Sequence, residues 1–88
     1  MVASADAVTI EIGDIWYNID LTNKQAEVTS GSIYSGAIVI PEKVTYKSAK
    51  YSVTSIGDGA FCSCIGLTSI MIPNSVTSIG IRAFCFCI

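Results

Sequence analysis

The first third of the chain alternates apolar and polar residues with a period of two. Residues 8–12 follow this pattern, and two further runs, 15–21 and 25–30, are separated from their neighbours by turn-forming residues. Alternation of this kind is typical of strands that bury one face, so we expect a three-stranded antiparallel meander. The sequence leaves its register open. The inward face takes either the parity of Trp16 or that of Ile15, Tyr17 and Ile19.

The second half of the chain repeats itself at a fixed interval. Residues 53–65 read VTSIGDGAFCSCI and residues 76–88 read VTSIGIRAFCFCI, an offset of 23 with ten of thirteen positions identical. An Ile-x-Ile-Pro-x-x-Val echo connects residues 37–44 with 69–76 at an offset of 32. A period in the twenties is typical of a solenoid, whose coils bury their apolar faces on one another. The nine extra residues, 45–53, predict a small hairpin that projects from the first coil.

Apolar positions within the coils predict the core. Their mixed spacing fits short strands joined by tight bends, and not a long helix or strand. Gly57 and Gly80 recur before an Ala-Phe pair, where we expect either a positive φ or a close approach between coils. Each Ala-Phe segment predicts one turn of 3₁₀- or α-helix, and Phe61 and Phe84 should stack on each other. The expected core residues are Ile38, Ile40, Val53, Ile56, Phe61, Cys64, Leu67, Ile70, Ile72, Val76, Ile79, Phe84 and Cys87.

Residues 67–87, LTSIMIPNSVTSIGIRAFCFC, resemble the BspA-type leucine-rich repeat, and the resemblance extends over about residues 37–88. It implies a mainly β fold: leucine-rich repeat coils over 37–88, with the hairpin insertion at 45–53. The β-rich residues 1–36 resemble the segment that opens such arrays, and imply an antiparallel β cap within the same structural domain. The resemblance also implies a secreted or cell-surface bacterial protein that adheres to a host or cell-surface protein partner.

The repeat frame, without evident chemistry, favours a non-enzymatic protein-binding module. Tyrosine dominates interface hot spots, so Tyr46 and Tyr51 on the predicted hairpin are candidate contacts, with core packing as the competing interpretation. The outward positions of the coil strands supply three more candidates, namely Val39, Ser69 and Met71. The alternative function is a scaffold that self-associates into a homo-oligomer through its unfinished last coil. Its candidate edge residues are Phe84, Phe86 and Ile88.

Composition and charge limit the classes of partner that we expect the chain to bind. The net charge is −2 and no basic cluster is present, which argues against nucleic acid and anionic membrane surfaces. Hydrophobic residues make up 51% of the chain and charged residues 14%, so intrinsic disorder is not expected. No apolar run reaches the length of a transmembrane helix, so we expect no membrane insertion, and no signal peptide is visible at the N-terminus.

Candidate chemistry is sparse. The pairs Cys62-x-Cys64 and Cys85-x-Cys87 read best as small buried apolar residues, with a tetrahedral zinc site or a disulfide between coils as open alternatives. Histidine is absent, which removes the commonest general base, so we expect no catalytic residues and no cofactor. Several polar residues lack the spacing of a calcium loop and read as turn residues. These are Asp14, Asp20, Asn23 and Glu27.

Overall fold

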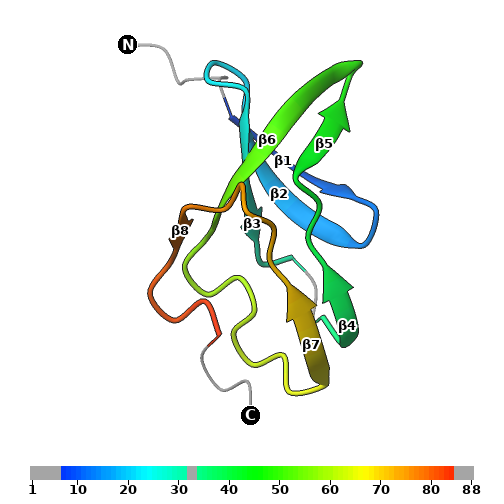
Figure 1. Ribbon diagram of the computed structural model, residues 1–88, viewed down its shortest axis with the longest axis vertical. Helices are drawn as coiled ribbons and strands as arrows, with labels where there is room; N and C mark the ends of the chain where they lie inside the picture. Colours follow the sequence, from blue (N-terminus) through cyan, green and yellow to red (C-terminus); the bar gives the residue numbers. More distant parts are fainter. Residues whose placement is uncertain (1–6, 32–33, 85–88) are drawn as a thin grey trace.

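The computed structural model describes residues 7–31 and 34–84, and its regular elements are all strands. The described part contains no helix. Figure 1 shows the arrangement of the strands. They are β1 (Ala7–Ile12), β2 (Ile15–Asp20), β3 (Gln25–Thr29), β4 (Gly36–Val39), β5 (Lys43–Tyr46), β6 (Ala49–Ile56), β7 (Leu67–Met71) and β8 (Ser78–Ile79).

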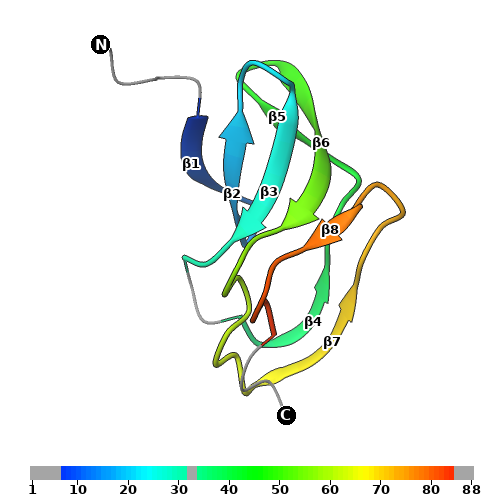
Figure 2. The ribbon, with the colours of Figure 1, turned by 90° about the vertical axis from the view of Figure 1, so that its left-hand side faces the viewer.

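The largest layer is a six-stranded sheet built around β6. The first three strands form the expected antiparallel meander, and β3 then pairs with β6 in parallel. On the other side of β6, β5 pairs antiparallel with its first half and β8 pairs in parallel with its last residues. Figure 2 shows the meander and β6 side by side, with β8 following on from them. The meander therefore shares one continuous sheet with the coil strands β6 and β8.

The two sequence offsets reappear as strand registers. In the second, two-stranded sheet, β4 and β7 pair in parallel, with Ile38 opposite Ile70. In the main sheet, Ile56 lies opposite Ile79. These pairs are 32 and 23 residues apart in sequence, so equivalent positions of successive coils lie beside each other, as a solenoid requires.

The core lies between the inward faces of the two sheets. Period-2 alternation in β2 places Ile15, Tyr17 and Ile19 inside and Trp16 on the outer face, which settles the register that the sequence left open. Phe61 is fully buried, with its ring 4.9 Å from that of Tyr34 and 5.4 Å from that of Phe84. The Phe61 and Phe84 rings are inclined by only 4°, so the expected stacking of the two coils' phenylalanines is present.

The two repeated glycines mark close backbone approaches. A Cβ on Gly80 would contact the backbone of Asp58 and lie 2.7 Å from the carbonyl carbon of Gly57. A Cβ on Gly57 would lie 3.1 Å from the Val28 carbonyl oxygen. Neither glycine has a positive φ, so the absence of a side chain, and not backbone freedom, is what these positions require.

Two expectations about local structure were wrong. The Ala-Phe segment after β6 forms successive single turns, because Gly59 and Ser63 have φ values of 71° and 63°, which an α- or 3₁₀-helix cannot contain. The hairpin of β5 and β6 exists, with Lys47 and Ser48 at its turn. It does not stand apart from the main sheet, however, since its second strand, β6, runs on to Ile56 and forms the centre of that sheet.

Two residues that were expected in the core are exposed instead. Ile72 is 39% exposed and Ile79 is 49% exposed. Their counterparts one coil earlier, Ile40 and Ile56, are 2% and 1% exposed. The earlier coil is covered by the later one, whereas no described residue stacks on the far side of β7 and β8. Repeat position thus predicts the direction of a side chain, and its burial depends on the next coil.

The other expected core positions fall into two groups. Ile40, Val53, Ile56, Phe61 and Cys64 are buried. A second group is partly buried and packs against them, namely Ile38, Leu67, Ile70, Val76 and Phe84. Cys87 lies outside the described residues.

Candidate functional site

The outer face of the β4–β7 sheet carries exposed apolar side chains. Val39 and Met71 lie opposite each other in the register and are 64% and 65% exposed. Ser69, two residues before Met71, is exposed on the same strand face. The structure thus brings together the three candidates taken from the outward positions of the coils, and we call Val39, Ser69 and Met71 the coil face.

An apolar pocket of about 460 Å³ adjoins the coil face. It lies between the β1–β2 turn and the strands β4 and β5, and Val39 lines it. Its other apolar walls are Ile12, Ile15, Tyr17, Ala37, Ile38, Pro41 and Val44. Two opposite charges, Asp14 and Lys43, also line it. An apolar pocket with a few polar groups is the usual form of a site that receives one anchoring side chain or small ligand.

The candidate tyrosines of the hairpin do not form a surface pair. Tyr51 is only 3% exposed, because it shares the inward parity of Val53 on β6, so its expected role as a surface contact is wrong. Tyr46 is half-buried, with its ring 6.3 Å from that of Tyr51. Each ring carries a lysine ammonium at cation–π distance, Lys47 over Tyr46 at 5.5 Å and Lys24 over Tyr51 at 5.3 Å. The two tyrosines of the hairpin are therefore packed against each other and against two lysines, Lys47 of the hairpin and Lys24 of the β2–β3 turn.

The self-association candidates lie at the end of the second coil. Phe84 is half-buried and stacks on Phe61, while Phe86 and Ile88 lie outside the described residues. The exposed apolar residues that the structure does describe here are Ile72, Ile79 and Ile81, the last of them 80% exposed. We call these three isoleucines the end face.

The cysteines differ in state. Cys64 is a buried free thiol, as expected for a small apolar core residue. Cys62 is disulfide-bonded, so packing alone does not describe this position. No group of three or more metal-ligating side chains occurs in residues 7–31 and 34–84. Of the two open alternatives, the disulfide is therefore the one that the described residues support, at Cys62.

Two tyrosines in the core have perturbed acidity. Tyr34 donates its hydroxyl hydrogen to the Thr29 carbonyl oxygen at 2.9 Å and accepts from the Trp16 amide at 3.0 Å. Burial raises the pKa of Tyr17 to about 12, and the neighbouring charge of an ionised Tyr34 adds to this. Burial likewise raises the pKa of Tyr34. Both side chains are buried as neutral groups, and Tyr34 connects the meander, through its hydrogen bonds, with the ring of Phe61 in the first coil.

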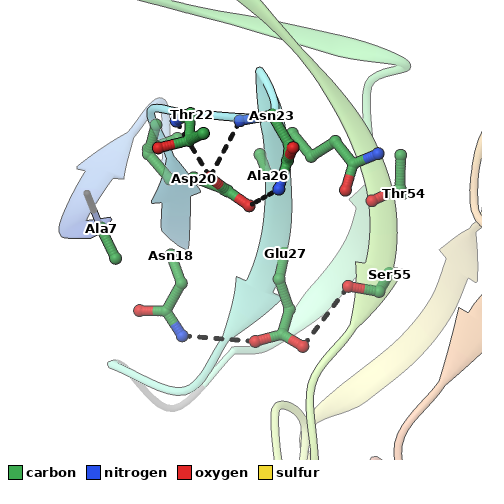
Figure 3. A pocket seen from close by; sticks show the side chains of 11 residues that line it. Ala7, Asn18, Asp20, Thr22, Asn23, Ala26, Glu27, Thr54 and Ser55 are labelled. Carbon is green, nitrogen blue, oxygen red and sulfur yellow. Dashed lines mark hydrogen bonds between the residues drawn. The ribbon is translucent and has the colours of Figure 1, made fainter. Parts of the chain in front are cut away.

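A polar pocket of about 550 Å³ lies on the outer face of the main sheet (Figure 3). A chain of side-chain hydrogen bonds crosses four strands there. The Thr9 hydroxyl donates to Asn18 Oδ1 at 2.6 Å, and Asn18 Nδ2 donates to Glu27 Oε1 at 3.3 Å. The Ser55 hydroxyl donates to Glu27 Oε2 at 3.4 Å. The pocket therefore has a carboxylate at its centre, held from both sides by neutral side chains.

Asp20 forms one rim of the polar pocket. Its Oδ1 accepts the backbone N–H groups of Thr22 and Asn23, both at 3.0 Å, and its Oδ2 accepts from Asn23 Nδ2 at 2.9 Å. These hydrogen bonds, led by the Asn23 amide, hold the pKa of the Asp20 carboxyl below its ordinary value. From the sequence alone, Asp20, Asn23 and Glu27 were interpreted only as turn residues. Their common pocket was missed because it depends on the β3–β6 pairing.

Residues 31–88 match the family model described as a BspA type leucine rich repeat region (6 copies). The chain belongs to the BspA-type leucine-rich repeat family. The match covers both coils and the β5–β6 hairpin, and it agrees with the strand registers at offsets of 32 and 23. The resemblance read from residues 37–88 is thereby confirmed.

Solved structures of similar proteins share the fold. A leucine-rich cell surface protein from Faecalibacterium prausnitzii A2-165 is 34% identical, with a TM-score of 0.76, over 93% of this chain and 22% of its own. A leucine-rich repeat protein from Bacteroides capillosus ATCC 29799 is 32% identical, with a TM-score of 0.75, over 90% of this chain and 59% of its own. None of the curated proteins matches the chain. This BspA-type chain thus spans less than two thirds of either relative.

Family membership gives a general function class. Leucine-rich repeats are modules of protein–protein interaction, and the F. prausnitzii relative is a cell surface protein. Residues 7–31 and 34–84 contain no helix of the length and apolarity needed to cross a membrane.

Proposed function

We propose that this BspA-type domain is a non-enzymatic adhesion module of a bacterial cell-surface or secreted protein, which binds a protein partner through its coil face. The observation that carries the proposal is the exposed pair Val39 and Met71 beside the apolar pocket. Exposed apolar surface of this kind on a folded protein marks an interaction site. In this proposal residues 1–36 serve as the cap of the array, and the hairpin contributes Lys43 and Val44 to the lining of the pocket.

The arrangement resembles the anatomy of an interface. Val39 belongs to both the coil face and the wall of the pocket, so an apolar side chain of a partner reaches the pocket while its backbone crosses β4 and β7. Asp14 and Lys43 supply a polar border, and desolvated apolar centres with polar borders are typical of protein interfaces. The expected partner is an extracellular protein segment that presents one large apolar residue between polar ones.

The experiment measures binding to a panel of purified extracellular-matrix and cell-surface proteins by surface plasmon resonance. We expect Val39→Lys to weaken binding at least tenfold, because it places a charge at the pocket wall. Ile65→Lys is the matched control, since Ile65 is equally apolar and 75% exposed but belongs to neither the coil face nor the end face. Thermal unfolding of both variants verifies folding. Equal binding by the Val39→Lys variant and the wild type, or no binding by any protein of the panel, would contradict the proposal.

A second candidate function, self-association, is supported by the end face. Ile72 and Ile79 are exposed where their counterparts Ile40 and Ile56 are buried. A second copy that covers β7 and β8 would restore the burial that the next coil gives elsewhere. Sedimentation velocity should then show a dimer that Ile79→Lys converts to a monomer. A wild-type protein that stays monomeric at high micromolar concentration would rule out this role.

A further inference from the structure

We propose that the polar pocket on the outer face of β1, β2, β3 and β6 is a binding site for a neutral saccharide. The pocket is separate from the coil face and shares no lining residue with the apolar pocket. Its volume of about 550 Å³ falls within the range of about 300–1,000 Å³ that is usual for ligand sites. Ligand binding at this pocket can therefore be tested independently of protein binding at the coil face.

The charge of the lining excludes anionic ligands. Asp20 and Glu27 are the two ionisable groups among the described lining residues, and no lysine or arginine is among them. The pKa of Asp20 is held below its ordinary value by its turn hydrogen bonds, so this carboxylate stays charged at neutral pH. Phosphate, sulfate and carboxylate ligands are repelled by such a site and find no cation there.

The balance of donors and acceptors selects hydroxyl groups over an ammonium group. Besides the two carboxylates, the lining presents the amides of Asn18, Asn23 and Gln25, which both donate and accept. The hydroxyl groups of Thr22, Thr54 and Ser55 do the same. An ammonium ligand only donates and needs acceptors alone, whereas sugar hydroxyls donate and accept at adjacent positions. The lining therefore matches a polyhydroxylated ligand.

Glu27 is the residue best placed to hold the ligand. Its two hydrogen bonds, of 3.3 and 3.4 Å, lie beyond the optimal range of about 2.7–3.2 Å, so its oxygens retain capacity to accept from vicinal hydroxyls. Its carboxylate is positioned by its neighbours: Asn18 and Ser55 flank it, and a Cβ on Gly57 would lie 3.1 Å from Glu27 Cδ. Figure 3 shows the Glu27 carboxylate between the side chains of Asn18 and Ser55.

The test is an array of neutral oligosaccharides, including glucans, galactans and mannans, followed by titration of the ¹⁵N-labelled protein with the best ligand. Sialylated and sulfated forms of the same glycans and a lysine-rich peptide serve as anionic and ammonium probes. We expect a neutral glycan to bind at up to millimolar concentration and to shift the amide signals of Asn18, Glu27 and Ser55. Binding of anionic glycans alone, of the peptide alone, or of no probe would overturn the proposal.

Variants localise the site. Glu27→Gln keeps the shape of the side chain and should weaken binding at least about tenfold, as the loss of a charge-assisted hydrogen bond predicts. Ser55→Ala should have a smaller effect in the same direction. Glu11→Gln makes the same chemical change at an exposed residue of β1 outside the pocket, and should leave the affinity unchanged. Equal affinities of the Glu27→Gln and Glu11→Gln variants would place any glycan binding elsewhere.

Discussion

Ile56 and Ile79 form a natural matched pair for testing the solenoid. They occupy the same repeat position and lie opposite each other in parallel strands, yet Ile56 is 1% exposed and Ile79 is 49% exposed. Truncation of a fully buried isoleucine to alanine costs about 2–5 kcal/mol, because both transfer free energy and a cavity are involved. At Ile79 about half of the transfer term is missing and solvent fills the space, so we expect a loss of about 1 kcal/mol or less.

Urea and thermal unfolding of Ile56→Ala and Ile79→Ala measure this difference. A domain of this size loses about 4–8 °C of Tm per kcal/mol, so Ile56→Ala should lower Tm by about 8–40 °C and Ile79→Ala by less than about 8 °C. If Ile56→Ala does not fold, Ile56→Val should still cost about 0.5–1.5 kcal/mol. Equal losses at both positions in dilute protein would refute the burial by the following coil.

Protein concentration separates two causes of a large effect at Ile79. If a second copy covers the end face, the Tm of the wild type rises with concentration, since association stabilises the folded state by mass action. The Tm of Ile79→Ala should then depend less on concentration. A large effect of Ile79→Ala that is independent of concentration would mean that the coil is packed differently.

Four further predictions follow from single contacts. Phe61→Ala should cost about 3–5 kcal/mol, because it removes a fully buried ring that contacts both Tyr34 and Phe84; near-normal urea unfolding would contradict this. Gly80→Ala should destabilise the fold far more than Gly13→Ala, because a Cβ at Gly80 would meet backbone atoms whereas a Cβ at Gly13 would meet none. This order is expected although Gly13 has a φ of 52° and Gly80 does not have a positive φ. Thermal unfolding followed by circular dichroism compares the two variants. The pKa of Tyr17, about 12, lies above the ordinary 10, so the contribution of Tyr17 to stability should be constant below pH 10 and fall between pH 10 and about 12; a native absorbance titration in which all tyrosines ionise near pH 10 would refute this. The pKa of Asp20 is lowered, so its contribution is present above the ordinary aspartate pKa of about 4 and is lost as the pH falls through the lowered value; the Tm difference between wild type and Asp20→Asn should vanish in acid.

Much of the fold was predictable because the repeats encode register directly. The 23- and 32-residue offsets became the pairings Ile56–Ile79 and Ile38–Ile70, and the period-2 runs became the meander. The stacked phenylalanines followed from repeat equivalence. These features depend on the local alternation of apolar and polar residues and on internal sequence repeats, and a single sequence shows both of these patterns.

The features that the sequence did not reveal depend on contacts between residues that are far apart in the sequence or on local backbone conformation. Tyr51 was expected on a short projecting hairpin, but β6 continues through Val53 to Ile56, and its parity places Tyr51 in the core. The single turn around Ala60 and Phe61 does not extend into a helix, because Gly59 before it and Ser63 after it have positive φ, which pattern alone does not reveal. The polar pocket requires Glu27 beside Ser55, and these residues lie on strands whose parallel pairing is not encoded in either offset.

The turn between β5 and β6 offers a place to modify the molecule without disturbing its repeats. Lys47 and Ser48 both adopt positive φ, at 49° and 68°, which a two-residue hairpin loop requires and which Asn-Gly adopts more readily. The nine additional residues of the first coil are taken up by this hairpin, so lengthening it leaves both inter-coil registers unchanged. A fluorophore or affinity tag placed at this tip would report on binding from the end of the molecule opposite β4 and β7 (Figure 1).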